Sequence, residues 1–142
     1  MSKNTEFTNK LRSSGLRPTK QRLKICEVLF NRDHTFHFTI NDLAKNISNE
    51  LNEKISLATV YNTVHAFKKK GYLKEISINS DKSYFDTNTT NHHHFFDEDT
   101  NELIDCDDGV IETPKIKKNI SGKKINSVEV LVKVATDNQN QK

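Results

Sequence analysis

Three consecutive histidines, His92, His93 and His94, are the residues in this sequence whose type and spacing best suit chemistry. If they lie on a strand, adjacent side chains point to opposite faces, so His92 and His94 project together while His93 faces away. Two imidazoles on one face are a good start for a site that binds Zn, Fe, Mn or Ni, and carboxylates complete such sites for the harder ions. The plain alternative is a solvated polar patch.

Carboxylates that could complete such a site stand near the triplet. Asp86 lies six residues before His92, and Asp105 ends a strand that we expect to pair with the histidine strand. His37 is a further candidate, because it stands just before an expected helix of the front half. Acids at hairpin distance from the triplet favour a metal site over a polar patch.

The two cysteines do not extend this chemistry. Cys26 and Cys106 lie far apart and neither belongs to a C-x-x-C pair, so a cysteine zinc clamp is not expected. Cys26 has apolar neighbours, and we expect a buried free thiol that acts as a small hydrophobe. A disulfide is not expected in a reducing compartment.

Size and composition favour a small dimeric protein. The chain has 142 residues, of which 33% are hydrophobic and 29% are charged. A monomer of this composition can form only a small hydrophobic core, and small modules commonly complete their cores by oligomerisation. A symmetric homodimer is therefore expected. No apolar run approaches the roughly 18 residues that span a bilayer, and residues 1–10 lack the apolar core of a signal peptide. We expect a cytoplasmic protein with no membrane partner.

Charge divides the chain more clearly than composition does. Residues 1–88 hold 15 Lys and Arg against 9 Asp and Glu, a net charge of +6, whereas residues 89–142 hold 7 against 10, a net charge of −3. A basic front half suits a polyanion such as DNA, and an acidic back half suits cations or a partner chain.

The expected elements of the front half follow the order of a winged helix-turn-helix. Capping residues and apolar spacing predict three helices, from about Arg17 to Asn31, from Thr39 onward and from Ser56 to Lys70. Strand patterns at Tyr72–Ile78 and Ser83–Asp86, around a polar turn, predict a hairpin that serves as the wing. The predicted fold class is α+β, with a winged-helix DNA-binding domain expected over residues 1–88.

The back half is predicted to be a small α/β dimerisation domain over residues 89–136. Strands are expected at His94–Phe96, at Glu102–Ile104 and at Val128–Val134, with a short helix within Val110–Ile120 whose start Pro114 limits. Residues 137–142 are polar and are expected to be a disordered tail.

The third helix is the expected recognition helix, because only the major groove is wide enough to admit a helix. Hydroxyl, amide and aromatic side chains in its first turns can read base edges, and basic residues at the start of the first helix suit phosphate contacts. The candidate readers are Ser56, Thr59, Tyr61, Asn62 and His65, and the candidate phosphate contacts are Arg17, Lys20 and Arg22. Each of these residues taken singly is also compatible with plain helix surface.

Several of these stretches, taken together, point to a known family. They are Leu16-Arg17-Pro18-Thr19-Lys20-Gln21-Arg22, Ala58-Thr59-Val60-Tyr61-Asn62-Thr63, Gly71-Tyr72-Leu73, Phe85-Asp86 and His92-His93-His94. In this order they resemble the ferric-uptake (Fur) superfamily over roughly residues 10–134. The stretches His92 to Phe96, Leu103 to Asp105 and Val128 to Val132 look most like its iron response regulator branch.

The resemblance implies a homodimeric repressor that binds a palindromic double-stranded DNA operator and controls iron homeostasis. Its regulatory metal, Fe²⁺ or Mn²⁺ with Zn²⁺ as a surrogate, is expected at the hinge between the domains. Carried over by position, the ligands are His37, Asp86, His92, His94 and Asp105. A possible second metal site would use His93 and Glu112, although the last family histidine of that site aligns near Val128.

Departures from the family pattern add further expectations. Asp97 to Thr100 replace the first cysteine pair of the common zinc clamp, so a structural zinc ion held by four cysteines is not expected. Asn62 stands where many members carry Arg, which favours a difference in the operator. The iron response regulator branch senses haem, which makes haem an alternative effector here, although the Cys-Pro haem motif of some members is missing.

In either case the expected switch is mechanical. A ligand held by both domains favours one angle between the two recognition helices of a dimer, and that angle must match half-sites about one helical turn apart. Peroxide, manganese, zinc and nickel sensing stay open within the family, and Asp105 is also the choice found in peroxide sensors. We do not expect an enzyme, although a non-haem iron oxygenase and a winged helix used only for protein contact are alternatives.

Overall fold

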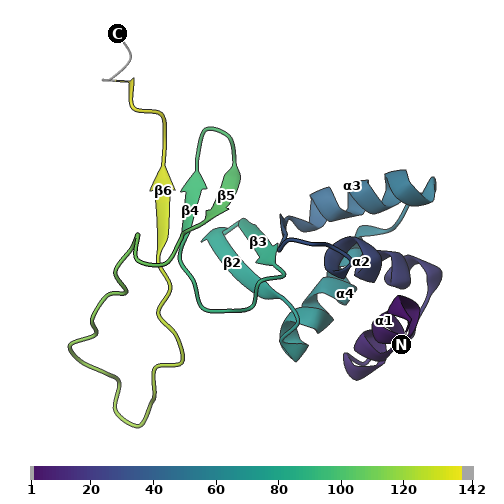
Figure 1. Cartoon of the computed structure of the whole chain (residues 1–142), viewed down its shortest axis with the longest axis horizontal. Coiled ribbons are helices and arrows are strands. Elements are labelled where there is room, and N and C mark those ends of the chain that lie inside the picture. Colours follow the sequence, from purple (N-terminus) through teal and green to yellow (C-terminus); the bar gives the residue numbers. More distant parts are fainter. Residues whose placement is uncertain (1, 139–142) are drawn as a thin grey trace. The chain divides into compact units, whose positions relative to one another are not determined.

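The computed structural model describes residues 2–138, which form two compact units, one up to Thr89 and one from Thr90 onward (Figure 1). The first unit contains four helices and a three-stranded sheet, and the second contains a second three-stranded sheet. The predicted α+β fold class is confirmed. The predicted domain boundary follows Asn88, one residue before the division of the structure.

The helices of the first unit begin at polar residues that cap them. They are α1 (Lys3–Ser13), α2 (Lys20–Phe30), α3 (Ile40–Leu51) and α4 (Leu57–Lys70). Ser2, Thr19, Thr39 and Ser56 are the N-caps, and each side-chain oxygen accepts the backbone N–H three residues on, which satisfies one unpaired donor of the first turn. The three predicted helices are confirmed. α1 was not predicted, because it buries only two residues, too few to give a periodic pattern.

The sheet of the first unit brings two candidate ligands together. β2 (Lys74–Asn79) and β3 (Lys82–Asp86) form the predicted hairpin, and the short β1 (His37–Phe38) adds antiparallel to β3 in the order β1-β3-β2. β1 was not predicted, since two residues carry no alternation. In this register His37 lies directly opposite Asp86.

The core of the first unit lies between the helices and the sheet. Val60, Val64 and Phe67 form the buried stripe of α4, and Cys26 is fully buried as expected. Burial raises the pKa of the Cys26 thiol to about 12, so this thiol stays protonated and unreactive near neutral pH. Tyr61, which follows this apolar spacing in the sequence, lies outside the stripe and is 53% exposed.

The second unit is a small mixed sheet in the order β5-β4-β6. β4 (His94–Asp97) pairs antiparallel with β5 (Glu102–Asp105) and parallel with β6 (Leu131–Val134). The predicted strands are confirmed, although the last begins three residues later than predicted. The backbone N–H of Val130 donates to Nδ1 of His93 at 2.8 Å, so this segment is held by a side chain before the strand begins.

The predicted helix within Val110–Ile120 is wrong. Residues 106–130, all of which the structure describes, form neither helix nor strand. Pro114 lacks a backbone donor, and Lys117 and Lys118 have no acid three or four residues away to support a helical turn. The predicted tail falls largely on residues 139–142, which lie outside the described residues. Of the helices described, none is both long and apolar enough to cross a membrane.

Candidate functional site

Three atoms that could bind a metal lie together in the second unit, on His92 just before β4, on His94 at its start and on Asp105 at the end of β5. Nε2 of His92 lies 3.0 Å from Oδ1 of Asp105, and Nε2 of His94 lies 3.1 Å from the same oxygen. The strand register places His94 opposite Asp105, and the two imidazole rings are 4.3 Å apart between centroids. Ligands at about 2.0–2.2 Å from a metal ion lie roughly 3 Å from one another, so these three atoms have the spacing of a metal site.

The hydrogen bonding of His92 shows why a cation fits there. Its Nδ1 lies 2.6 Å from the carbonyl oxygen of Thr90, and because a carbonyl only accepts, Nδ1 must carry the proton. In the neutral ring Nε2 then presents a lone pair toward the Asp105 carboxylate, which is also an acceptor. A metal ion between these two atoms would satisfy both acceptors, with Thr90 orienting the imidazole ring.

The first unit carries a smaller pair of the same kind. Nε2 of His37 lies 3.0 Å from Oδ2 of Asp86, whose carboxylate is fully buried. The other oxygen, Oδ1, accepts the backbone N–H of Asn88 at 2.8 Å and fixes the carboxylate in place. Lys74 lies across the ladder, where burial lowers its pKa and the Asp86 charge opposes that change. This pair offers one nitrogen and one oxygen ligand.

His93, the histidine predicted for a second metal site, is hydrogen-bonded to residues other than the candidate ligands described above. His93 accepts the Val130 N–H at Nδ1, so in the neutral ring Nε2 carries the proton and donates to the Thr113 hydroxyl at 3.0 Å. Glu112 is exposed. His93 therefore already holds residues 113 and 130 together, and a metal ion would have to displace Thr113. The second site stays a prediction.

The three candidate phosphate contacts share one hollow of the first unit. Arg17, Lys20 and Arg22, at the start of α2, line a hollow of about 380 Å³ together with Thr59 at the start of α4. Arg22 donates from Nη1 to the Arg17 carbonyl at 3.0 Å, and its Nε is buried without a hydrogen-bond partner. A donor that is buried and unsatisfied costs free energy until an acceptor reaches it. A phosphate oxygen is such an acceptor.

The predicted base readers divide into two groups along α4. Tyr61 and Asn62 are exposed, whereas Ser56 and Thr59 bond to each other at 2.8 Å as part of the cap. His65 is half-buried, and the centroid of its ring lies 4.1 Å from that of the Tyr61 ring. His65 therefore packs against the tyrosine and helps to position it.

One neighbouring side chain was missed as a reader. Leu57 is 53% exposed and lies one helical turn before Tyr61, where an apolar group could meet a thymine methyl. Leu57 is apolar, as the residues of a buried stripe are, so only the orientation of the helix shows that it is exposed.

The sequence of this chain matches a known protein family over most of its length. A model of the ferric uptake regulator family matches residues 13–134. The chain belongs to the ferric uptake regulator family. Members of this family are transcription regulators and not enzymes, which agrees with the expectation drawn from the sequence.

Relatives in the family include peroxide-responsive and ferric uptake regulators. The peroxide-responsive repressor PerR of Staphylococcus aureus is 37% identical over 95 residues, which cover 67% of this chain and 62% of that protein. The matched part thus spans less than two thirds of this curated relative. The iron response regulator branch stays a prediction, since these matches support the family but not that branch in particular.

Solved structures of Fur-family proteins share the fold. The ferric uptake regulator of Vibrio cholerae matches with a TM-score of 0.67 and 26% identity, covering 91% of this chain and 98% of that one. The regulator from Pseudomonas aeruginosa with manganese matches with a TM-score of 0.64 and 26% identity, covering 96% and 98%.

Proposed function

We propose that this chain is a metal-responsive transcription repressor that binds a palindromic DNA operator as a homodimer in the cytoplasm. We further propose that one Fe²⁺ or Mn²⁺ ion is held by both units, through His37, Asp86, His92, His94 and Asp105. The observation that carries this proposal is the approach of His92 Nε2 and His94 Nε2 to the same Asp105 oxygen, at 3.0 and 3.1 Å.

The ligand chemistry supports one shared ion rather than two separate ones. The first unit offers two ligand residues and the second offers three, and neither set alone completes the five or six positions that Fe²⁺ and Mn²⁺ usually fill. Together they give three imidazole nitrogens and two carboxylates, a mixture suited to these ions. Two carboxylate charges also neutralise one divalent cation, which lowers the cost of burying it.

Sharing the ion explains how metal binding changes DNA affinity. When bound, the metal supplies attraction to donors on both sides of the linker around Thr89. The histidines and carboxylates of this chain then restrict the hinge and favour one spacing of the two α4 helices in a dimer. Because half-sites lie about one helical turn apart, only a matching spacing binds tightly. We expect metal to promote operator binding, as in ordinary members of the family.

Metal stoichiometry and operator binding test the proposal together. Metal-free protein titrated with Mn²⁺ should bind one ion per protomer at the shared site, and its operator affinity should rise at least tenfold, a coupling of about 1.4 kcal/mol. Calorimetry and a fluorescence-anisotropy titration on a selected operator measure the two quantities. The proposal would be overturned if each protomer bound two independent ions, or if the operator affinity were the same with and without Mn²⁺.

Haem is the other effector that the sequence suggests. Haem binding can be measured on the same metal-free protein. A haem complex has an intense absorption band that a Mn²⁺ complex lacks. Tight one-to-one haem binding that is lost in His92→Ala and that changes operator affinity, with no effect of Mn²⁺, would replace the divalent ion by haem.

Peroxide sensing is a second candidate, favoured by Asp105 and by the names of the curated relatives. In such sensors bound iron leads to the addition of oxygen to a ligand histidine. Protein loaded with Fe²⁺ and treated with hydrogen peroxide should gain the mass of one oxygen atom on His37 or His92, and should release its operator. Protein loaded with Mn²⁺ is the matched control. Mass spectra without added oxygen on either histidine would exclude this mechanism.

A further inference from the structure

His65 connects the candidate base reader Tyr61 to the sheet of the first unit. The two residues are one helical turn apart on α4, where side chains at positions i and i+4 meet, and their ring centroids lie 4.1 Å apart. The His65 ring also meets Phe85 of β3, with centroids 5.5 Å apart and ring planes at 85°. This edge-on arrangement is favourable for two aromatic rings. The exposed Tyr61 ring is thus supported, through His65, by a ring of the core.

Phe85 is a fixed point because the core of the first unit surrounds it. Its side chain is only 2% exposed, and its ring stacks on that of Phe38 in β1, with centroids 5.7 Å apart. The strand register pairs the same two residues. Since core side chains are closely packed and keep one rotamer, a shift of β3 would change the contact between Phe85 and His65.

The residue that follows Phe85 on β3 is the candidate metal ligand Asp86. The same ladder pairs Asp86 with His37, the other candidate ligand of the first unit. β1 is only two residues long, so the ladder offers few hydrogen bonds to hold this strand. With an ion bound, His37 and Asp86 would hold β1 on β3 more firmly, and the stacked pair of Phe38 and Phe85 would be ordered with them.

The position of α4 does not depend on the His65 ring. Val64 and Phe67 of the same helix are fully buried, and Lys68 forms an ion pair with Glu75 of β2. Removing the His65 ring should therefore leave the helix in place and withdraw only the support of the tyrosine.

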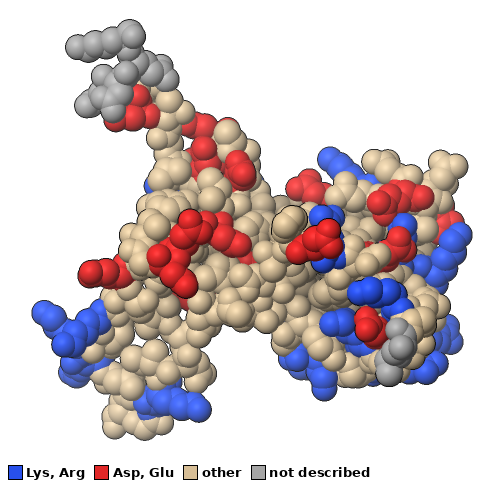
Figure 2. Space-filling model, viewed as in Figure 1, with Lys and Arg blue, Asp and Glu red and all other residues tan. Residues whose placement is uncertain are grey.

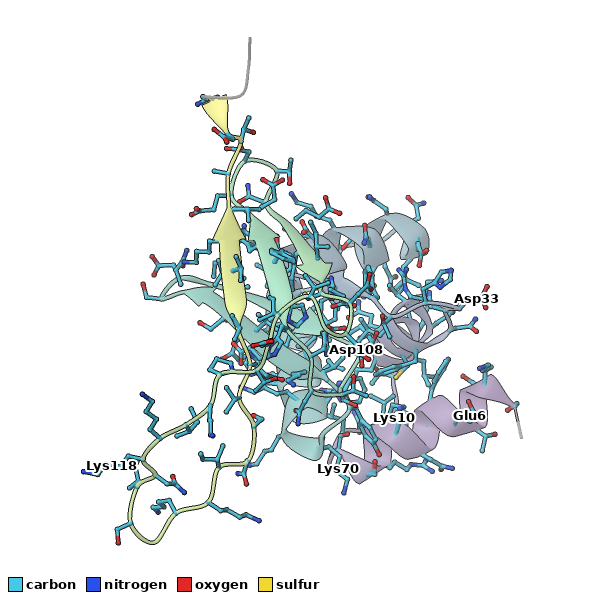
Figure 3. All side chains as sticks on the ribbon, turned by 60° about the vertical axis from the view of Figure 1, so that its left-hand side comes forward. Glu6, Lys10, Asp33, Lys70, Asp108 and Lys118 are labelled. Carbon is cyan, nitrogen blue, oxygen red and sulfur yellow. The ribbon has the colours of Figure 1, made fainter. Side chains whose placement is uncertain are left out.

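Attraction to phosphates is provided by other residues of this unit. Lys and Arg side chains are spread over the outer surface of its helices, as the blue patches in Figure 2 show. Figure 3 shows Lys70 at the end of α4, in a last turn that also contains Lys68 and Lys69. Such charges set the affinity for DNA of any sequence. The aromatic contacts should therefore affect sequence discrimination and not salt dependence.

We propose that His65 is a specificity-determining residue, which acts by holding the Tyr61 ring in one orientation toward the bases. Its contact with Phe85 couples this orientation to the strand that carries Asp86, so that metal binding sharpens the choice of sequence within a single unit. A reader that is ordered beforehand loses less conformational freedom on binding, which favours the sequence that it fits. This inference rests on the proposed function and adds to the hinge a second effect of the metal.

A DNA with a single half-site separates this effect from the hinge. Only one α4 can bind such a DNA specifically, so the spacing of two helices has no influence on the affinity. Discrimination is the ratio of the affinities for half of a selected operator and for unrelated DNA of the same length, measured by fluorescence anisotropy. Mn²⁺ should raise this ratio by about two- to tenfold in the wild type, the gain expected from ordering one side chain.

Two substitutions of His65 distinguish a supporting ring from a hydrogen-bonding reader. His65→Phe keeps an aromatic ring against Tyr61 and Phe85, so its discrimination and its response to Mn²⁺ should be close to those of the wild type. His65→Gln keeps hydrogen-bonding groups without the ring and should lose both. The opposite pattern would mean that His65 reads a base directly, and would overturn the proposal. His34→Ala, at an exposed histidine outside α4, is the control.

A double-mutant cycle shows whether His65 acts through Tyr61. The support has nothing to hold once the tyrosine is removed, so Tyr61→Ala combined with His65→Gln should lose no more discrimination than Tyr61→Ala alone. Losses that simply add would contradict the proposal. The salt dependence of binding to unrelated DNA should be the same in all these variants, and this shows that they are folded.

Hydrogen exchange gives a readout without DNA. Mn²⁺ should slow the exchange of the backbone amides of β1 and β3, equally in the wild type and in His65→Gln, since the ligands lie on the strands themselves. Unchanged exchange in these strands would overturn the coupling. A full-operator affinity that is the same with and without Mn²⁺ would contradict the proposed function. A metal effect on the full operator without one on half-site discrimination would contradict this inference alone.

Discussion

The His92→Ala variant is expected to bind Mn²⁺ at least about a hundredfold more weakly than the wild-type chain, because even residues that only support a ligand change metal affinity by about 10–100-fold. In the proposed site His92 would contribute a ligand nitrogen whose orientation is fixed by the Thr90 carbonyl. Among the described imidazoles of the second unit, only His92 and His94 lie beside Asp105. Isothermal titration calorimetry measures the loss, with His34→Ala, an exposed histidine outside this cluster, as the control.

The same variant should also lose its stabilisation by metal. At a free Mn²⁺ concentration a hundredfold above the dissociation constant, the wild type should gain about 2.7 kcal/mol in free energy of unfolding, whereas His92→Ala should gain almost nothing. Urea unfolding with and without Mn²⁺ gives both values. Equal stabilisation of the two proteins would mean that the ion binds elsewhere, and a loss caused by His34→Ala would show that the effect is not specific to the ligand.

The helices of the first unit could be predicted because their determinants are local. Thr39 and Ser56 cap their helices through contacts only three residues long, and Gly71 ends α4 in the left-handed conformation, with a φ of 94° that favours glycine. Such determinants are readable in a single sequence. β1 was missed for the opposite reason, since it exists only through pairing with β3, where the partner of His37 lies 49 residues further along the chain.

The predicted helix within Val110–Ile120 shows where apolar spacing misleads. Ile116 and Ile120 are four residues apart, as on one face of a helix, but they are both exposed in the structure. Helices shorter than about 12–15 residues depend on tertiary packing for most of their stability, and the sequence does not reveal whether a packing surface is available. The five lysines within residues 113–127 add repulsion that no acid in this segment offsets.

Part of the candidate metal site could be predicted from alternation. The strand pattern predicts His92 and His94 on one side, and the structure puts both beside Asp105, although β4 begins only at His94. The carbonyl of Thr90, which fixes the proton on His92 Nδ1, could not be predicted, because backbone oxygens carry no sequence signature. The same holds for His93, whose side chain makes hydrogen bonds to residues 20 and 37 positions away.

DNA binding should separate into a phosphate part and a base part when the two surfaces of the first unit are changed independently. The double variant Arg17→Gln and Lys20→Gln removes two charges from the hollow at the start of α2. Each lost phosphate contact lowers the slope of log affinity against log salt by about 0.9, so the slope should flatten by about 1.8 while sequence preference is kept. Arg22 is left in place because it supports the Arg17 backbone.

Tyr61→Ala should show the converse behaviour, since Tyr61 is uncharged and exposed at the start of the recognition helix. Its loss should cost about 1–3 kcal/mol of discrimination between the operator and unrelated DNA, with an unchanged salt slope. Anisotropy titrations at several salt concentrations, on both DNAs, measure slope and discrimination together. The variant Lys45→Gln and Lys54→Gln, with the same change in net charge at exposed positions, is the control. Equal flattening by this control would mean that net charge, rather than the hollow, sets the affinity.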